Sequence, residues 1–300
     1  MFRFCINPTA LDLPRSCALL HGVARSYRVA GYRTTLALKS VIRGAACYTT
    51  PRARHLVTED AFLILNRGQQ YDLEFVDSRL TETLCPFFQP GFLEHVAHSL
   101  RSSAERQLDQ IEADGPALEF PERLYPMRGA VARALGGLRR GLATPPASDS
   151  WLEDQLYALA AALIGIREQV PREIDRFPGR RPATRAELFR RLHRGRDFLL
   201  SHYDRRVTIA EAAQAACLSP FHFHRMFKEA FGTTPLQFLQ EHRLAIARRL
   251  LWTTDQPVTV ICLGVGFQSI GTFSWLFRRR FGLSPRQFRG RCSSRSTPQD

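Results

Sequence analysis

A repeat in the last third of the chain constrains its fold more than any other feature. Residues 219–238 can be laid on residues 269–288 at a constant offset of 50, and eight positions carry the same residue. In each copy, a serine can cap the start of a helix, and a glycine that can adopt the left-handed conformation can end that helix. The phenylalanines spaced four apart share one helix face and are predicted to be buried. These pairs are Phe223 with Phe227 and Phe273 with Phe277.

A shorter helical pattern precedes each copy. Apolar residues recur at helical spacing over 209–216 and again over 258–265. A short helix, a tight turn and a second helix with a cationic outer face are typical of the helix-turn-helix, whose second helix enters the DNA major groove. The alternative is a pair of α-hairpins that only pack together. That alternative does not explain why equivalent outward positions carry Lys228 and Arg278.

The charge of the chain is concentrated in the same region. The 300 residues have a net charge of +14, and residues 185–300 hold 19 Lys+Arg against 8 Asp+Glu. A compact segment this basic attracts a polyanion, most often nucleic acid. Only Lys39 and Lys228 are lysines, which indicates a bias toward arginine across the genome. Such a bias does not explain why the two parts of the chain differ.

Residues 185–292 resemble the DNA-binding domain of AraC/XylS-type bacterial transcription regulators. In that family two helix-turn-helix units are joined by a long helix, expected here at about Pro235–Leu251. The residues that carry the resemblance are Ser219-Pro220, Arg225-Met-Phe-Lys228, Phe231-Gly-Thr-Thr-Pro235, Val265-Gly-Phe267 and Phe281-Gly-Leu-Ser-Pro285.

The N-terminal part resembles the cupin-like sensor domain that is often fused to this module. The matching stretches are Asn66–Gln69, Tyr71–Leu73 and Phe87–Phe92. The resemblance implies an α+β chain, with a cupin-like β-barrel and flanking helices followed by an all-α domain of two helix-turn-helix units. It also implies that the N-terminal domain binds a small effector, dimerises, or does both.

The resemblance places particular residues against DNA. The first recognition helix offers Pro220, Phe221, His222, His224, Arg225 and Lys228, and the second offers Ile270, Gly271, Thr272, Ser274, Trp275 and Arg278. Arg279, Arg280 and Arg286 are expected at phosphates. Arg225 is the best base reader, because its fork can bind guanine, whereas the equivalent position in the second helix is Trp275. We therefore expect asymmetric reading, with Trp275 either touching DNA or packing in the core.

Earlier residues predict strands and then helices. Apolar or alternating patterns predict strands at 36–42, 61–65 and 71–75, as in a small barrel or sandwich. Helical spacing follows at 92–112 and at 150–170, where Ser150-Trp-Leu-Glu153 reads as a capping box and Pro171 as the end. The expected organisation is a tail (1–20), a cupin-like domain (21–90), a helical extension (91–175), a linker (176–184), the DNA-binding domain (185–292) and a flexible tail (293–300).

One leucine stripe has two interpretations. Leu152, Leu156, Leu159 and Leu163 recur along one face of the helix expected at 150–170. They either form the interface of a homodimer or pack on the barrel.

Enzymatic chemistry is not indicated. The sequence has no glycine-rich nucleotide fingerprint, phosphate loop or nucleophile elbow. His222 and His224 point in different directions on a helix, and His21 and His55 lie far apart in the sequence. His95 and His98 fall on an expected helix. We therefore predict no enzyme, no metal and no cofactor, and a metal-dependent cupin enzyme fused to a DNA-binding module is only a remote alternative.

These patterns predict a sequence-specific regulator of transcription, more often an activator in this family, that is controlled by an unidentified small molecule. Its expected partners are double-stranded DNA, RNA polymerase and a second copy of the chain. The alternative is an effector-independent regulator whose N-terminal domain only dimerises or binds another protein. The sequence has no long apolar run, no signal-peptide pattern and no paired cysteine spacing, which predicts a cytoplasmic protein without a membrane partner.

Overall fold

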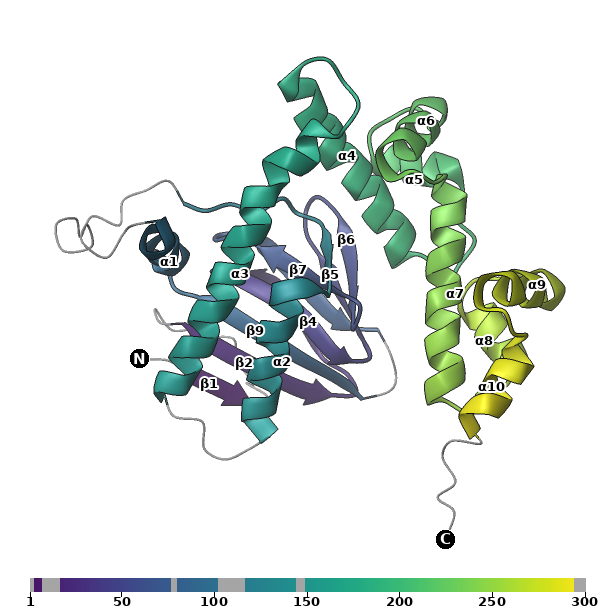
Figure 1. Cartoon of the computed structure of the whole chain (residues 1–300), viewed down its shortest axis with the longest axis horizontal. Helices are drawn as coiled ribbons and strands as arrows, with labels where there is room; N and C mark the ends of the chain where they lie inside the picture. The colour runs from purple at the N-terminus through teal and green to yellow at the C-terminus, as the bar shows by residue number, and fades with distance from the viewer. Residues whose placement is uncertain (1–2, 7–16, 77–79, 102–116, 144–148, 294–300) are drawn as a thin grey trace, which may run out of the picture. The chain divides into compact units, whose positions relative to one another are not determined.

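The computed structural model describes residues 3–6, 17–76, 80–101, 117–143 and 149–293. The chain divides into two compact units, Met1–Arg190 and Arg191–Asp300 (Figure 1). The division lies inside helix α4 (Pro182–Ser201), later than the linker expected at 176–184. The helix begins at Pro182, so the irregular stretch between helices is shorter than its Pro, Gly and Arg residues suggest. None of the described helices is both long and apolar enough to cross a membrane.

The N-terminal unit contains two β-sheets. Six strands pair in the order β1-β2-β9-β4-β7-β10, and four pair in the order β3-β8-β5-β6. The strands are β1 (Arg3–Ile6), β2 (Ala18–Ala24), β3 (Arg28–Arg33), β4 (Leu36–Arg43), β5 (Ala45–Thr49), β6 (Arg54–Thr58), β7 (Ala61–Leu65), β8 (Gln70–Phe75), β9 (Thr81–Phe88) and β10 (Leu124–Pro126). Neighbouring strands are antiparallel except for β1 and β2, which are parallel.

The sheet architecture adds detail to two expectations. The strands predicted at 36–42, 61–65 and 71–75 are present as β4, β7 and β8. However, the strand pairing of the described residues gives two separate sheets, so the closed cupin-like barrel is not observed. Within the tail expected at 1–20, Arg3–Ile6 form β1, which pairs with β2 along one edge of the larger sheet. Strand β1 is too short to give a clear period-two pattern, and for this reason the sequence did not reveal it.

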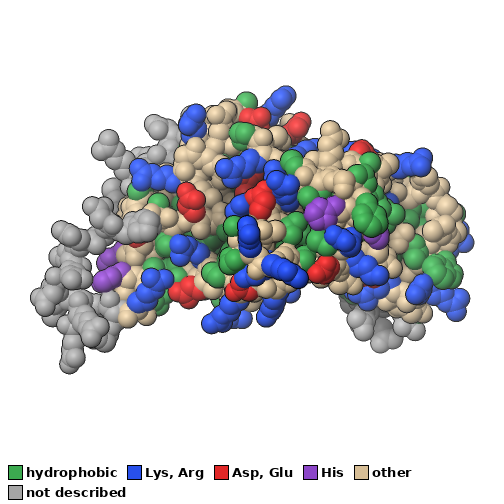
Figure 2. All heavy atoms as spheres, turned by 90° about the horizontal axis from the view of Figure 1, so that it is seen from above, with side chains coloured by type: hydrophobic (Ala, Val, Ile, Leu, Met, Phe, Trp, Pro, Cys, Tyr) green, Lys and Arg blue, Asp and Glu red, His purple; other side chains and the backbone are tan. Residues whose placement is uncertain are grey.

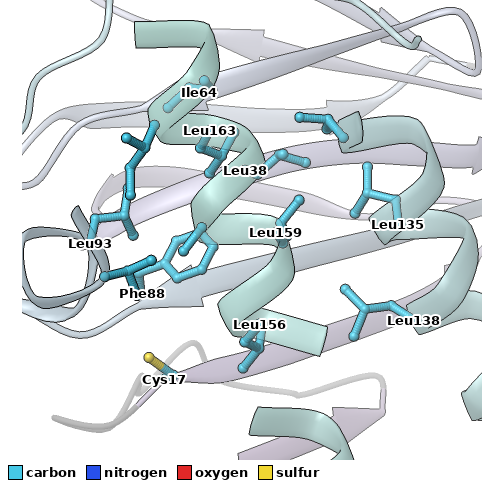
Figure 3. Close-up of a cluster of buried hydrophobic side chains, with 14 of the residues drawn as sticks. Cys17, Leu38, Ile64, Phe88, Leu93, Leu135, Leu138, Leu156, Leu159 and Leu163 are labelled. Atoms are coloured by element: carbon cyan, nitrogen blue, oxygen red, sulfur yellow. The ribbon is translucent and has the colours of Figure 1, made fainter. Parts of the chain in front are cut away.

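Three helices belong to the main hydrophobic core of this unit. They are α1 (Phe92–Arg101), α2 (Gly129–Ala143) and α3 (Asp149–Asp175). Figure 3 shows Leu156, Leu159 and Leu163 of α3 together with Leu38 and Phe88 of the sheet. The leucine stripe that was offered for dimerisation (Leu152, Leu156, Leu159 and Leu163) is therefore buried inside one chain. Packing on the sheet, the second interpretation of the stripe, is the one observed.

The limits of these helices differ from the prediction. Helix α3 begins at Asp149, so Ser150 lies within it and is not its N-cap. The helix also continues through Pro171 to Asp175, because a proline removes one amide donor without preventing the next residues from forming bonds. Helix α1 ends at Arg101, and the rest of the helix expected to 112 lies outside the described residues.

The C-terminal unit is helical. After α4 come α5 (Ile209–Ala215), α6 (Pro220–Phe231), α7 (Pro235–Thr253), α8 (Val258–Gly264), α9 (Ile270–Phe281) and α10 (Pro285–Ser293). Helix α7 is the long connecting helix predicted from the sequence, and α6 and α9 lie along it toward opposite ends (Figure 1). Gly195 of α4 permits close packing, because a Cβ there would collide with the Phe223 ring of α6.

Candidate functional site

Helices α6 and α9 start and end in the same way. The Ser219 and Ser269 hydroxyls accept from the backbone N–H groups of His222 and Thr272, each at 3.4 Å. Gly232 and Gly282 end the two helices in the left-handed conformation, with φ of 71° and 78°. Both caps were predicted from the repeat and are confirmed. The two helices are therefore built from the same local rules.

The buried faces of the two helices are also equivalent. In α6, the Phe227 ring centre lies 5.4 Å from Phe223, 4.5 Å from Phe231 and 5.6 Å from Phe238. The corresponding distances from Phe277 to Phe273, Phe281 and Phe288 are 5.7, 4.6 and 5.7 Å. Aromatic pairs at these separations attract each other in addition to burying apolar area. The same inner contacts therefore hold both helices in place.

Neighbouring segments fix the first helix-turn-helix unit. Thr208 and Glu211 form a capping box at the start of α5. The pKa of Glu211 is lowered to about 2, chiefly because the Thr208 backbone N–H donates to its carboxylate and also because Arg205 pairs with it. Arg243 of α7 donates through Nε to the Tyr203 carbonyl at 2.7 Å and through Nη2 to the Arg205 carbonyl at 2.5 Å. These bonds connect α7 with the loop before α5.

Helix α6 presents its proposed DNA-contacting residues at its surface. Phe221 is 77% exposed, and Pro220, Arg225 and Lys228 are exposed as well. His222 and His224 are half-buried. A shallow hollow on this surface is lined by Phe221, His224, Arg225, Lys228 and Glu229. The Arg225 guanidinium lies 5.9 Å from the Phe221 ring centre, so the cation and the ring can approach one ligand together.

Helix α9 carries a different set of exposed residues. Trp275 is 59% exposed, so it does not pack in the core, and Ile270, Gly271, Thr272 and Arg278 are also exposed. Ser274 is half-buried. The Arg279 guanidinium lies 5.3 Å from the Trp275 ring centre. This helix therefore presents apolar and aromatic surface at the position where α6 presents Arg225.

The arginines expected at phosphates have different surroundings. Arg286 is exposed at the start of α10. The Arg280 Nε donates to Glu241 Oε2 of α7 at 2.8 Å, with both side chains more than half exposed. An exposed ion pair of this kind is weak, so Arg280 can exchange Glu241 for a phosphate at little cost. On the face shown in Figure 2, Lys and Arg side chains are spread more widely than Asp and Glu.

Comparison with known proteins identifies this region. Residues 212–291 match the family model described as "Helix-turn-helix domain". This segment is similar to helix-turn-helix domains. The match agrees with the helix-turn-helix pattern that the sequence predicts in this segment. The match includes α6, α7, α8 and α9, and therefore both copies of the repeat.

Several curated relatives share the helix-turn-helix domain. The transcriptional activator RhaS of Escherichia fergusonii is 40% identical over 92 residues, which are 31% of this chain and 33% of the relative. The arabinose operon regulatory protein of Salmonella typhimurium is 36% identical over 92 residues, 31% of each chain. The chain thus spans about a third of the length of these curated relatives.

One solved structure is similar to about a third of this chain. The DNA-binding domain of AdpA, a global transcriptional factor determined in complex with a target DNA, is 31% identical and covers 35% of this chain and 95% of that one. Its TM-score is 0.34. The family match covers residues 212–291 only, so the cupin-like resemblance of the N-terminal unit stays a prediction.

The N-terminal unit contains a cavity that sequence reasoning missed. Its volume is 300 Å³, and its lining residues come from β2, β4 and β9 of one sheet and from β5 and β8 of the other. Lys39, Tyr48 and Tyr71 are buried in its wall, whereas Tyr27 and Phe75 are partly exposed. The cavity therefore lies between the sheets. The one signal in the sequence was Lys39, a rare lysine in the middle of an apolar strand.

The histidines considered as metal ligands have other partners. His21 Nε2 lies 3.0 Å from Glu82 Oε1, and His55 Nε2 lies 3.1 Å from Glu122 Oε1. Burial is the largest single influence on the pKa of Glu122 and raises it. Hydrogen bonds from His55 and Thr50 to the carboxylate, together with nearby positive charge, outweigh burial, so the pKa of Glu122 is lowered. Within the described residues, no group of three or more His, Cys, Asp or Glu side chains could hold a metal ion.

Proposed function

We propose that this chain is a sequence-specific DNA-binding regulator that activates transcription. The observation that carries the proposal is the pair of equivalently capped helices, α6 and α9, that present Arg225 and Trp275 at equivalent exposed positions. The relatives named as transcriptional activators or operon regulators share this segment, which supports the same role here. RNA polymerase is then the expected partner of the DNA-bound chain.

The two helices read DNA differently in this proposal. Arg225 binds guanine O6 and N7 with its fork, and Phe221 contacts a thymine methyl group. The remaining proposed contacts in α6 are Pro220, His222, His224 and Lys228, and those in α9 are Ile270, Gly271, Thr272, Ser274, Trp275 and Arg278. Because α9 presents fewer polar groups, it contributes shape fit, while Arg279, Arg280 and Arg286 contact phosphates and set the register.

The N-terminal unit senses a small molecule in this proposal. The support for sensing is the cavity between its two sheets, because ligand sites are concave, mostly apolar and furnished with a few polar groups. A ligand that binds one arrangement of the chain better than another shifts the balance between them, and through it the affinity for DNA. The chain also forms a homodimer, through residues other than the buried leucine stripe of α3.

The experiment that tests DNA reading is selection of bound sequences from random duplexes with the full chain, followed by titration of the best sequence. We expect a defined operator and at least a hundredfold preference over random duplex. The Arg225→Ala variant lowers that preference by about 1–3 kcal/mol, whereas Arg139→Ala retains it, because Arg139 is an exposed residue of the N-terminal unit. A chain that binds every duplex equally would contradict the proposal.

A further inference from the structure

The wall of the N-terminal cavity contains a buried cation. Lys39 is 1% exposed. Its Nζ donates to the Tyr71 hydroxyl at 3.1 Å and lies 3.8 Å from the centre of the Phe87 ring. In the described part of the chain, no carboxylate pairs with this ammonium. A buried charge without a counter-charge lowers stability, so a chain that retains one at this position is expected to use it.

The alternation of strand β4 directs this side chain into the space between the sheets. Leu38 belongs to the core formed with the helices, and successive side chains of a strand point to opposite faces. Lys39 therefore points away from that core and toward β5 and β8. Burial lowers its pKa to about 8. The group still carries its proton at pH 7, because that pH lies below the lowered pKa.

The remaining walls accept an apolar body and supply a second donor. Leu20, Leu73, Phe75 and Phe87 are among the apolar residues that line the cavity. The Tyr71 hydroxyl accepts from Lys39, so its own hydrogen is available to a ligand. The 300 Å³ volume is about twice the ~150 Å³ of a cavity that holds one benzene ring. One ammonium, one hydroxyl and hydrocarbon walls suit a ligand with one charged end.

We propose that this cavity binds a small organic acid, with its carboxylate against Lys39 Nζ and the Tyr71 hydroxyl and its apolar body along Leu20 and Leu73. Sugars and phosphate esters fit less well, because they need several polar partners or more than one cation. The inference rests on the proposed effector-sensing role of the N-terminal unit and names the chemical class of its ligand.

Calorimetric titration of the full chain tests this ligand class. The probes are benzoate, hexanoate, octanoate and decanoate, each compared at pH 7 with its own primary amide. We expect at least one acid to bind tenfold or more tightly than its amide. In Lys39→Met, which retains the unbranched stem without the charge, the amide still binds and the preference for the acid disappears. Arg43→Met removes an exposed cation from the same strand and leaves the preference unchanged.

Each other outcome has a defined meaning. Equal affinity for acid and amide in the unmodified chain would overturn the acid ligand and leave effector sensing in place. A preference for the acid that persists in Lys39→Met would overturn the role of Lys39. If no probe binds, the inference fails, while operator selection by the same preparation decides separately whether the chain is a DNA-binding regulator. Tyr71→Phe, which retains the charge, should weaken acid binding less than Lys39→Met does.

Discussion

Arg225 and Trp275 occupy equivalent positions on two equivalent helices, yet their side chains can recognise different things. The planar guanidinium of Arg225 offers several fixed donors, which match the two acceptors of a guanine edge. The indole of Trp275 has a single donor and a large apolar face. Because both side chains are exposed, their difference bears on what the helices contact and not on how they fold.

This difference predicts unequal effects of truncation. We expect Arg225→Ala to cost about 1–3 kcal/mol of discrimination at one base pair of the operator. Trp275→Ala should weaken binding to all variants of that operator by a similar factor. Titration of a set of single base-pair substitutions with each variant measures both effects. Equal loss of base preference in the two variants would contradict asymmetric reading.

The buried Lys39 predicts a pH dependence of stability. Its pKa is about 8 in the folded chain and 10.5 as the ordinary value, so between these pH values the unfolded chain binds more protons. The free energy of unfolding therefore gains a contribution from this group as pH rises through that window, of order ~3 kcal/mol in all. Tyr48, Tyr71 and Cys85 surround the cavity with Lys39, and the two tyrosines have raised pKa values because they are buried.

Comparison with Lys39→Met isolates this contribution. The variant is expected to be more stable than the unmodified chain at pH 7, and its advantage should shrink between pH 8 and pH 10. Urea unfolding of both proteins at several pH values measures the difference, in which the titration of groups that do not interact with Lys39 cancels. A difference that stays constant with pH would show that Lys39 has an ordinary pKa.

At the scale of elements, the two copies of the repeat depend on their end residues. Gly232 ends α6 with φ of 71°, and a Cβ placed on it would meet nothing within 4 Å. A side chain at this position would therefore lower stability only through the unfavourable left-handed backbone conformation, and not through a collision. Gly271 lies in the first turn of α9, where the helical conformation suits any residue.

Alanine substitutions at the two glycines should thus have opposite effects. Gly232→Ala is expected to lower the free energy of unfolding by about 1–2 kcal/mol, because the left-handed conformation is unfavourable for alanine. Gly271→Ala is expected to raise it by up to about 1 kcal/mol, because alanine favours a helix more than glycine does. Chemical denaturation of each variant gives both values. Equal destabilisation by the two substitutions would mean that their side chains, and not the backbone, set the cost.

The sequence predicted those features of the helices and strands that depend on residues close together in the chain, and it did not predict those that depend on distant segments. The caps at Ser219 and Gly232 involve neighbours in the chain, so the repeat revealed them. The order of the strands could not be predicted, because it depends on contacts between distant segments, such as β4 with β9, that no short pattern records. The leucine stripe of α3 has the same spacing whether it faces a sheet or another chain, so only the structure could separate these interpretations.

The candidate sites were predicted unequally for a related reason. The exposed residues of α6 and α9 follow from helical periodicity once the buried phenylalanines are known. The cavity around Lys39 needs β4, β8 and β9 to come together, and only then does a lysine in an apolar strand acquire surroundings. Its rarity in an arginine-rich chain was a signal, but it did not say what the lysine faces.

At the scale of the whole molecule, charge governs how the chain approaches DNA. Most of the net charge of +14 belongs to residues 185–300. Binding of cationic side chains to DNA releases counterions from the phosphates, and this release gains less entropy as the salt concentration rises. The affinity for DNA should therefore fall steeply with salt. The effect depends on contacts with phosphates and is largely independent of base sequence.

Single arginine variants should divide into two groups in such measurements. Arg278→Ala is expected to reduce the slope of log affinity against log salt by about 1, because one phosphate contact is lost. Arg139→Ala removes the same charge from the N-terminal unit and should leave the slope unchanged. Titrations of one operator at four or more salt concentrations, by fluorescence anisotropy, provide the slopes. Equal slopes for the two variants would place Arg278 away from the DNA backbone.

The shared inner contacts of α6 and α9 have a consequence for how such a protein can change its target. Each helix is held by its buried phenylalanines, its serine cap and its glycine end, none of which is among the residues proposed to contact DNA. Substitutions among the outward residues of one helix therefore leave the folding of both intact. The part of the operator that one helix reads can therefore change by exchange of a few surface side chains, while the other helix continues to bind its original part of the operator.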